Sequence, residues 1–462
     1  MNLSKFSNFV NLLYPHELKY LDTVGQFENE EILRIIDRIR YNVYNPEKTK
    51  DFFEDIDKRK YSYLMKWIKE KLVQADVDVF FEWIIKMEKD INMDNVLPED
   101  EKKLLKYTKT ILPTSYFFIR FYEMLNAYRD YLLIRTRILY YESVLHFLRK
   151  YESDYLKAVE LNRKMNNSAV DIISHHLSSH GDSIQWEPFL IDTFNNKSID
   201  GFTRYKALIR TTYIHYNYRK FDELRSIYDE LDKVIQTEAF YSKRILANYY
   251  SNRAMMHSML REMEQAEYYA YLSVRQKNSD YLFYLIKLCN ILIIQNKNKT
   301  ALKIMTENIS ELKTNNSMYT QIGFISVYIR TLNKNEKYAK GESFGESFLA
   351  THKKEIFSFR WHIFFCAYFM SLLKQEKYKK LLSIEKRYKL VQREEEFYGN
   401  ARYIPTIQWY HSLAQYMEGK INEEQLQNII LISSRKTQNN KYLNMKIKEL
   451  RNDIFDFLPN VF

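Results

Sequence analysis

Apolar and polar residues alternate with the period of an α-helix along most of the chain. Residues 28–40 place isoleucine and leucine on one face, residues 61–73 repeat this pattern, and residues 77–87 are apolar nearly all round. Such spacing predicts amphipathic helices in the first two segments and a buried helix in the third. A further helix is expected to start at Pro98, which three acidic residues follow, and to end before Pro113.

Loops and changes of pattern divide the chain into three predicted regions. We expect an N-terminal helical domain over residues 1–112, a helical connecting region over 113–200, and helix hairpins over 201–462. Within the connecting region, residues 115–151 contain neither Gly nor Pro and could form one long helix or two. The main boundary is placed in the loop at residues 195–201.

The turns between helices recur at similar but irregular intervals after this boundary. The residues that follow successive turns are spaced by 42, 35, 40, 40 and 43 positions. They are Phe221, Met263, Asn298, Tyr338, Tyr378 and Ile421. Because a single hairpin cannot bury its own apolar face, such hairpins stack on their neighbours. The spacing therefore predicts roughly six stacked hairpins over residues 203–430.

One of these hairpins, residues 246–275, has small residues where its two helices would meet. The small residues and the tyrosines beside them are Ala254, Ala266, Ala270, Tyr268, Tyr269 and Tyr271. This segment resembles a tetratricopeptide repeat, a family whose strict period is about 34 residues. The resemblance extends in weaker form over residues 203–430. It implies an all-α protein in which a right-handed solenoid follows the N-terminal helices, with the first helix of each hairpin on the concave wall.

Composition agrees with a helical chain that has a sizeable core. Its 462 residues include only 8 Gly and 7 Pro, whereas an all-β protein needs many of both for its turns. Apolar residues make up 46% and charged residues 28%. The net charge of +11 fits an acidic partner such as nucleic acid, anionic lipid or an acidic peptide, but it also fits the residue bias of an AT-rich genome.

The cellular location is inferred from three features. The only cysteines, Cys289 and Cys366, lie in apolar helical segments without metal-ligand spacing, which suits a reducing compartment. The N-terminus lacks the apolar core of a signal peptide, and no run of 18 apolar residues occurs. We therefore expect a cytoplasmic protein with no membrane partner.

Polar residues on successive first helices form the candidate peptide-binding site. They are Lys206, Arg210, Asn248, Asn252, Lys287 and Asn290. The tetratricopeptide resemblance gives these positions a role, because peptide-clamping members use Lys, Arg and Asn on the same helix faces. Cations there bind a carboxylate, and asparagine amides hold the peptide backbone. The resemblance thus implies a protein or peptide segment as partner, and ordinary solvated side chains are the alternative interpretation.

Other chemical motifs are weaker. His176 and His180 are one helical turn apart and, with Asp182, could hold a metal, but a polar helix end explains them equally well. The basic run over residues 377–389 is interpreted as a solvated helix face, so nucleic acid is possible but not favoured. We expect no resident metal, no cofactor and no catalytic residue, since no phosphate-binding or nucleophile motif occurs.

These observations favour a non-enzymatic scaffold that binds a protein or peptide on its concave face. The alternative is a peptide-sensing regulator whose N-terminal helices act on DNA or a response protein, an arrangement similar to Gram-positive quorum-sensing regulators. Residues 16–24 and 29–40 could form its helix-turn-helix, although acidic residues at the start of the second helix would repel phosphates. An enzyme within residues 1–200 is the third possibility.

Overall fold

Helices form in the segments that the helical period predicted, but the helix at residues 77–92 is amphipathic rather than buried, because Val79 and Ile85 are exposed. The computed structural model describes residues 3–178, 182–236, 240–396, 404–435, 441–455 and 457–458, and within these ranges it contains helices and no strand. The all-α prediction is confirmed. None of the helices in these ranges is long and apolar enough to cross a membrane.

The chain divides into two compact units, and each unit is built from three separate segments of the chain. Unit 1 comprises Met1–Ile172, Ser183–Ile214 and Glu223–Leu246, and unit 2 comprises Ile173–Asp182, His215–Asp222 and Ala247–Phe462. The division therefore comes later in the chain than the predicted boundary at residues 195–201, and the helices after that loop begin within unit 1.

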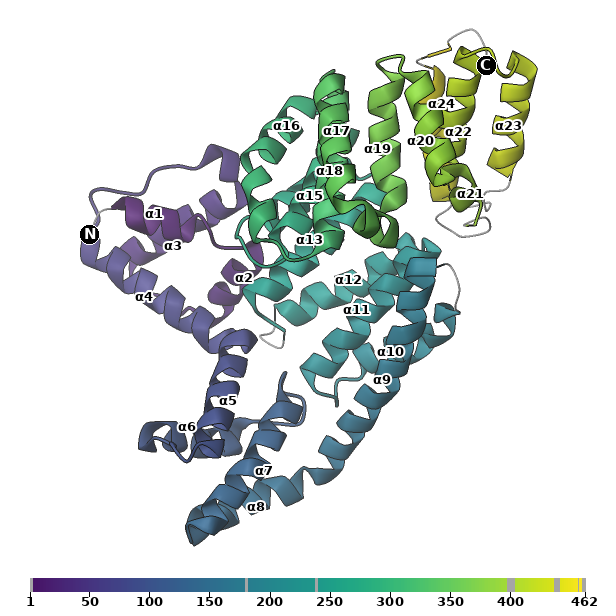
Figure 1. Ribbon diagram of the computed structural model, residues 1–462. Helices are drawn as coiled ribbons and strands as arrows, with labels where there is room; N and C mark the ends of the chain where they lie inside the picture. The colour runs from purple at the N-terminus through teal and green to yellow at the C-terminus, as the bar shows by residue number, and fades with distance from the viewer. Residues whose placement is uncertain are drawn as a thin grey trace. The chain divides into compact units, whose positions relative to one another are not determined.

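Unit 1 contains the helices of the N-terminal half (Figure 1). They are α1 (Leu3–Val10), α2 (Pro15–Val24), α3 (Glu30–Tyr44), α4 (Lys58–Ala75), α5 (Val77–Asn92), α6 (Pro98–Thr110), α7 (Phe118–Ile134), α8 (Ile138–Lys150), α9 (Glu152–Ser178), α10 (Glu187–Asn195), α11 (Gly201–Tyr218) and α12 (Phe221–Ile235), with α9, α11 and α12 shared with unit 2. The predicted start at Pro98 and the break before Pro113 are confirmed.

Long-range polar contacts explain why α12 belongs with the N-terminal helices. The hydroxyl of Tyr241 donates to Glu17 Oε1 over 2.7 Å, and Glu17 is fully buried in α2. On the same helix, His16 Nε2 lies 2.7 Å from Asp232 Oδ1. Gly201 marks a close approach rather than a domain boundary, because a Cβ there would lie 2.8 Å from a neighbouring aromatic ring.

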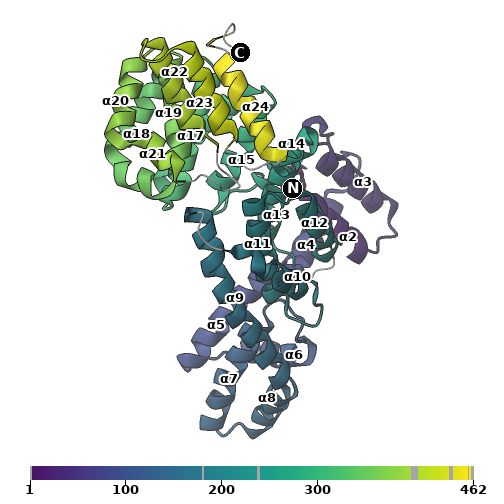
Figure 2. The ribbon, with the colours of Figure 1, turned by 90° about the vertical axis from the view of Figure 1, so that its right-hand side faces the viewer.

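Unit 2 consists of consecutive helix hairpins. Its elements are α13 (Lys243–Met259, whose first turn belongs to unit 1), α14 (Met263–Ser273), α15 (Tyr281–Ile294), α16 (Asn298–Glu307), α17 (Met318–Lys334), α18 (Tyr338–Phe359), α19 (Trp361–Leu373), α20 (Tyr378–Tyr388), α21 (Leu390–Glu395), α22 (Thr406–Met417), α23 (Glu423–Arg435) and α24 (Lys441–Phe455). The first helices α15, α17, α19 and α22 contact one another in that order, and the second helices pack beside them (Figures 1 and 2).

The hairpins share one type of turn. A residue with positive φ precedes each second helix by two positions, at Arg219, Arg261, Asn296, Glu336 and Glu376. The next backbone N–H returns to the first helix, as in the 2.9 Å bond from Lys337 to the carbonyl of Leu332. This is the bond pattern of a Schellman motif, which ends a helix sharply. The second helices consequently start at the predicted residues, except that α23 starts at Glu423 rather than at Ile421.

The same turn settles whether residues 115–151 form one helix or two. Thr136 has a φ of 57°, and the N–H of Arg137 bonds to the carbonyl of Leu132 over 3.0 Å. The stretch therefore forms the separate helices α7 and α8.

The turns store strain that glycine would relieve. Glu376 is exposed and has a φ of 57°, so Glu376→Gly should raise the free energy of unfolding by up to about 1 kcal/mol. Lys303→Gly, at an exposed position inside α16, is the matched control and should lower it by about 1 kcal/mol. Denaturant unfolding of both variants tests the assignment, and equal losses of stability would contradict it.

Candidate binding face of unit 2

The first helices of unit 2 leave one narrow stripe of side chains partly exposed. In α15 nine of the 14 residues are buried, and the partly exposed ones include Phe283, Lys287 and Asn290, which lie on one helix face. In α13 the corresponding stripe includes Asn248 and Asn252. In α15, burial of the remaining faces confines the long polar side chains Lys287 and Asn290 to the stripe.

Hydrogen bonds connect the stripes of neighbouring helices. Lys287 Nζ donates to Asn252 Oδ1 over 3.1 Å, and Asn252 Nδ2 donates to Asn248 Oδ1 over 3.0 Å. Between the next two helices, an Arg330 guanidinium nitrogen donates to Asn290 Oδ1 over 3.3 Å. We call these five residues the polar row. Four of them were predicted as site residues, and the structure brings them to one face.

The sequence analysis missed Arg330, although a signal for it exists. Asn290 lies eight residues before α16 begins, and Arg330 lies eight residues before α18 begins, so the two occupy the same place in successive hairpins. Likewise Asn252 and Lys287 each lie eleven residues before the next helix. Extending the alignment by one hairpin would have found the arginine.

Arg360 is a second arginine of this face that the sequence analysis missed. Its guanidinium carbon lies 3.7 Å from the ring centre of Tyr319 in α17. A Cβ on Gly323, one turn further along α17, would lie 2.0 Å from a guanidinium nitrogen of Arg360, so a larger residue there would require the end of this arginine to move. The arginine therefore lies flat across α17 at the start of α19.

Lys287, Arg330 and Arg360 are all partly buried. Within the part of the chain that the structure describes, none of them forms an ion pair with a carboxylate. Burial lowers the pKa of Lys287 to about 7, Asp280 opposes this shift, and Arg360 adds to it. The face thus presents cations that the protein itself does not neutralise.

The two other predicted site residues, Lys206 and Arg210, belong to unit 1 and are engaged or buried there. Lys206 donates to Asn162 and places its ammonium group 4.5 Å from the ring centre of Phe202. Burial lowers the pKa of Lys206, which Asp200 opposes, and burial also lowers the pKa of Arg210. The six predicted residues are therefore divided between the units. In unit 2, hydrogen bonds join Asn248, Asn252 and Lys287, and Asn290 lies on the same face of α15 as Lys287.

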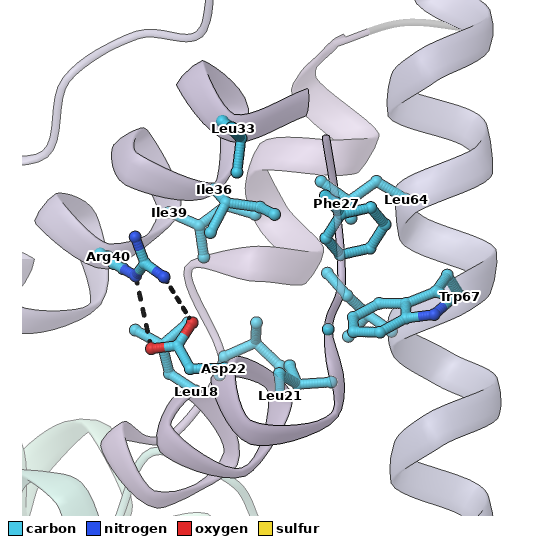
Figure 3. A pocket seen from close by; sticks show the side chains of 13 residues that line it. Leu18, Leu21, Asp22, Phe27, Leu33, Ile36, Ile39, Arg40, Leu64 and Trp67 are labelled. Carbon is cyan, nitrogen blue, oxygen red and sulfur yellow. Dashed lines mark hydrogen bonds and ion pairs between the residues drawn. The ribbon is translucent and has the colours of Figure 1, made fainter. Parts of the chain in front are cut away.

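An apolar hollow in unit 1 was not anticipated (Figure 3). It has a volume of about 100 Å³, and its wall is formed by Leu13, Leu18, Leu21, Asp22, Gly25, Phe27, Leu33, Ile36, Ile39, Arg40, Leu64, Trp67 and Ile68. At one side Arg40 holds Asp22 through two hydrogen bonds of 2.8 and 3.3 Å. The side-chain hydrogen bond to Asp22 raises the pKa of Arg40. The hollow offers apolar contact and one fixed ion pair, and no nucleophile lines it.

The helices proposed for a helix-turn-helix are present as α2 and α3. Asn29 caps α3 by accepting hydrogen bonds from the N–H groups of Glu31 and Ile32, at 3.1 and 3.2 Å. The arginines of α3 have partners inside unit 1, since Arg34 and Arg38 both lie over the ring of Phe53. With these side chains so engaged, α3 offers little free positive charge to a phosphate backbone.

One cluster in unit 2 has the residue types of a cysteine nucleophile site. His362 Nε2 lies 2.6 Å from Glu394 Oε1, and the sulfur of Cys366 lies 3.8 and 3.9 Å from the two ring nitrogens. Burial lowers the pKa of His362, but its contacts with Cys366 and Glu394 raise it well above the usual range. Almost equal distances place the sulfur beside the ring rather than in line with one N–H, so the pair is poorly aligned for proton transfer.

Glu394 has a structural partner that explains the cluster. It accepts the backbone N–H groups of Ile407 and Gln408 over 2.9 and 2.8 Å, at the start of α22. A carboxylate is stabilised at a helix N-terminus, so Glu394 fastens α21 to α22.

The side chains of the histidines that were weighed as metal ligands, namely His175, His176 and His180, fall outside the part of the chain that the structure describes. Among the side chains that are described, no group of three His, Cys, Asp or Glu residues is placed to hold a metal.

The position of Lys287 predicts a specific pH dependence. Its pKa is about 7 in the folded protein and near 10.5 in an unfolded chain, so unfolding takes up a proton between these values. Stability should therefore rise with pH from about 7 to about 10 in the wild type, relative to Lys287→Met. Thermal unfolding at several pH values measures the difference. Lys354→Met, at an exposed position of α18, should follow the wild type, and parallel curves for wild type and Lys287→Met would refute the assignment.

Comparison with known proteins gives no assignment. No protein-family model matches the chain, and neither the curated proteins nor the solved structures contain a match.

Proposed function

We propose that the protein is a non-enzymatic cytoplasmic scaffold that binds a segment of a partner protein on the first helices of unit 2. Unit 2 is, in this proposal, a solenoid of the tetratricopeptide type. Its consecutive hairpins, whose first helices contact one another, support this arrangement.

The observation on which the proposal depends is the set of cations without carboxylate partners. Lys287, Arg330 and Arg360 come from successive first helices and have no ion pair among the described residues. A half-buried cation gains most from a carboxylate that reaches it, because solvent screens the pair less than at an open surface. An acidic segment of a partner is therefore the ligand that this face suits best.

The asparagines of the polar row suit the main chain of the same segment. A side-chain amide has two donor hydrogens and two acceptor lone pairs, so Asn252 and Asn290 keep capacity for a peptide N–H or C=O beside the hydrogen bonds that they already form. Combined with cations, such amides distinguish an extended or helical peptide from a free anion, because a free anion needs donors alone.

A peptide selection tests the proposal. A random 16-residue peptide library displayed on phage is selected on the wild-type protein, and we expect the recovered peptides to be enriched in Asp and Glu. Affinity of a selected peptide should fall at least about tenfold in the double variant Lys287→Ala, Arg360→Ala, since each charge-assisted hydrogen bond is worth roughly 1.5–3 kcal/mol.

The control variant also removes two positive charges, but at positions on the second helices. Lys303→Ala combined with Lys354→Ala removes two exposed lysines of the second helices α16 and α18, and it should leave the affinity unchanged. Thermal unfolding of both double variants shows whether the folds are intact. Recovery of peptides without acidic enrichment, or an equal loss of affinity in the control, would exclude the proposed binding mode.

A further inference from the structure

The C-terminal helix α24 packs on α22 of the preceding hairpin and also runs back over earlier hairpins (yellow in Figure 2). A terminal helix that simply caps a repeat array packs on the repeat before it. At its first turn, however, α24 contacts the beginning of α12. Tyr442 packs edge-on against Phe221 with ring centres 4.8 Å apart, and its hydroxyl donates to Asp222 over 3.3 Å.

Contacts with three further hairpins follow along the helix. Glu449 pairs with Arg261 in the turn after α13, and Asp453 lies 3.7 Å from Lys334 at the end of α17. Beyond the helix, the ring of Phe457 receives the ammonium group of Lys374 at 4.4 Å, just after α19. The helix thus crosses a row of hairpin turns at the carboxyl ends of the first helices.

The buried face of α24 is that of a helix lying in a groove. Leu443, Ile447, Leu450 and Ile454 recur at intervals of four, three and four residues, and all are at least 92% buried. On the opposite face, charged residues such as Lys448 and Arg451 are exposed. A groove recognises an amphipathic helix of a partner through an apolar stripe with this spacing.

Charge on the two sides of this contact is partly complementary. We call the surface under α24 the wall. It contributes the cations Arg261, Lys334 and nearby Arg330, and α24 contributes the acids Glu449 and Asp453. Lys446 is the exception, because it brings a further cation close to two wall arginines.

The environment of Lys446 shows the mismatch. Burial lowers the pKa of Lys446, and Glu449, 2.7 Å away, opposes the shift. The guanidinium groups of Arg330 and Arg261 lower it further. A helix with a neutral residue at this position would avoid the repulsion.

We propose that α24 is an exchangeable occupant of this wall and that a partner displaces it with an acidic amphipathic helix. That helix has aliphatic residues at the positions of Leu443, Ile447, Leu450 and Ile454, and acids at those of Glu449 and Asp453. The inference rests on the proposed function, because it names the partner's chemistry and the internal segment that competes with it.

The order of the helices makes such an exchange feasible. α15, α17, α19 and α22 contact one another directly, so the departure of α24 would separate no pair of stacked hairpins. While it is joined to the chain, its effective concentration at the wall is on the order of millimolar. A free helix therefore competes poorly with α24 unless the link between α23 and α24 is cut or the free helix makes better contacts with the wall.

The experiment cuts the link between α23 and α24 in the full-length protein. A protease recognition sequence replaces residues 436–440, between α23 and α24, and the folded protein is cleaved. A fluorescent synthetic peptide of residues 441–458 is then titrated into cut and uncut protein, and mass spectrometry follows the native C-terminal fragment. We expect the peptide to displace the fragment from the cut protein and to bind the uncut protein at least about tenfold more weakly.

Peptide variants test the assigned chemistry. Glu449→Gln with Asp453→Gln, which neutralises two wall-facing acids, should weaken binding at least about tenfold. Lys448→Gln with Arg451→Gln, the matched change on the exposed face, should alter it less than about twofold. Lys446→Gln should strengthen binding, because it removes the repulsion from Arg261 and Arg330.

Each remaining outcome overturns the inference. If the fragment leaves only when the whole protein unfolds, α24 is an integral part of the fold. If cut and uncut proteins bind the peptide equally, the peptide occupies another surface. Failure of the proposed function is recognised separately, because the selected acidic peptides would then bind without any dependence on Lys287 and Arg360, whether or not α24 exchanges.

Discussion

The packing of first helices on one another determines what unit 2 can do. α15, α17, α19 and α22 contact each other in sequence, and each also receives a second helix, so most of their circumference is buried. Close packing leaves no place for a long polar side chain among these contacts. Such a side chain can therefore occur only on the stripe that no neighbour covers. Lys287 and Asn290 lie there in α15, and Arg330 lies there in α17.

The same packing gives these side chains their electrostatic character. The ammonium group of Lys287 lies 4.6 Å from the ring centre of Phe283 and donates to the amide of Asn252 rather than to a carboxylate. Burial lowers its pKa to about 7, so a carboxylate that reaches it would also favour its protonated form. Where α24 lies against the earlier hairpins, Glu449 and Asp453 pair with cations of unit 2, whereas no described carboxylate forms an ion pair with Lys287, Arg330 or Arg360.

Whether the sequence could predict a feature depends on how far apart in the sequence the residues that determine it lie. The hairpin turns are local, so their spacing located the starts of α12, α14, α16, α18 and α20. Four of the six site residues came together because their helices pack in chain order. The close approach at Gly201 and the packing of α24 on earlier hairpins involve residues that are far apart in the sequence. Helical periodicity does not predict such contacts. Arg360 was missed because its place depends on Gly323 in another helix.

Net charge alone would have pointed to the wrong surfaces. The chain has an excess of 11 positive charges, yet the arginines of α3 are held by acids and by Phe53, and in the basic run both Lys377 and Lys380 pair with Glu342. Positive charge that is already paired attracts an acidic partner weakly, because the partner must compete with the internal carboxylate. Exposed cations of unit 2 such as Lys354 and Lys379 also have no ion pair among the described residues, so under the proposed function it is the partial burial of Lys287, Arg330 and Arg360 that favours an acidic segment. The basic composition is thus compatible with an acidic protein segment as ligand without requiring nucleic acid.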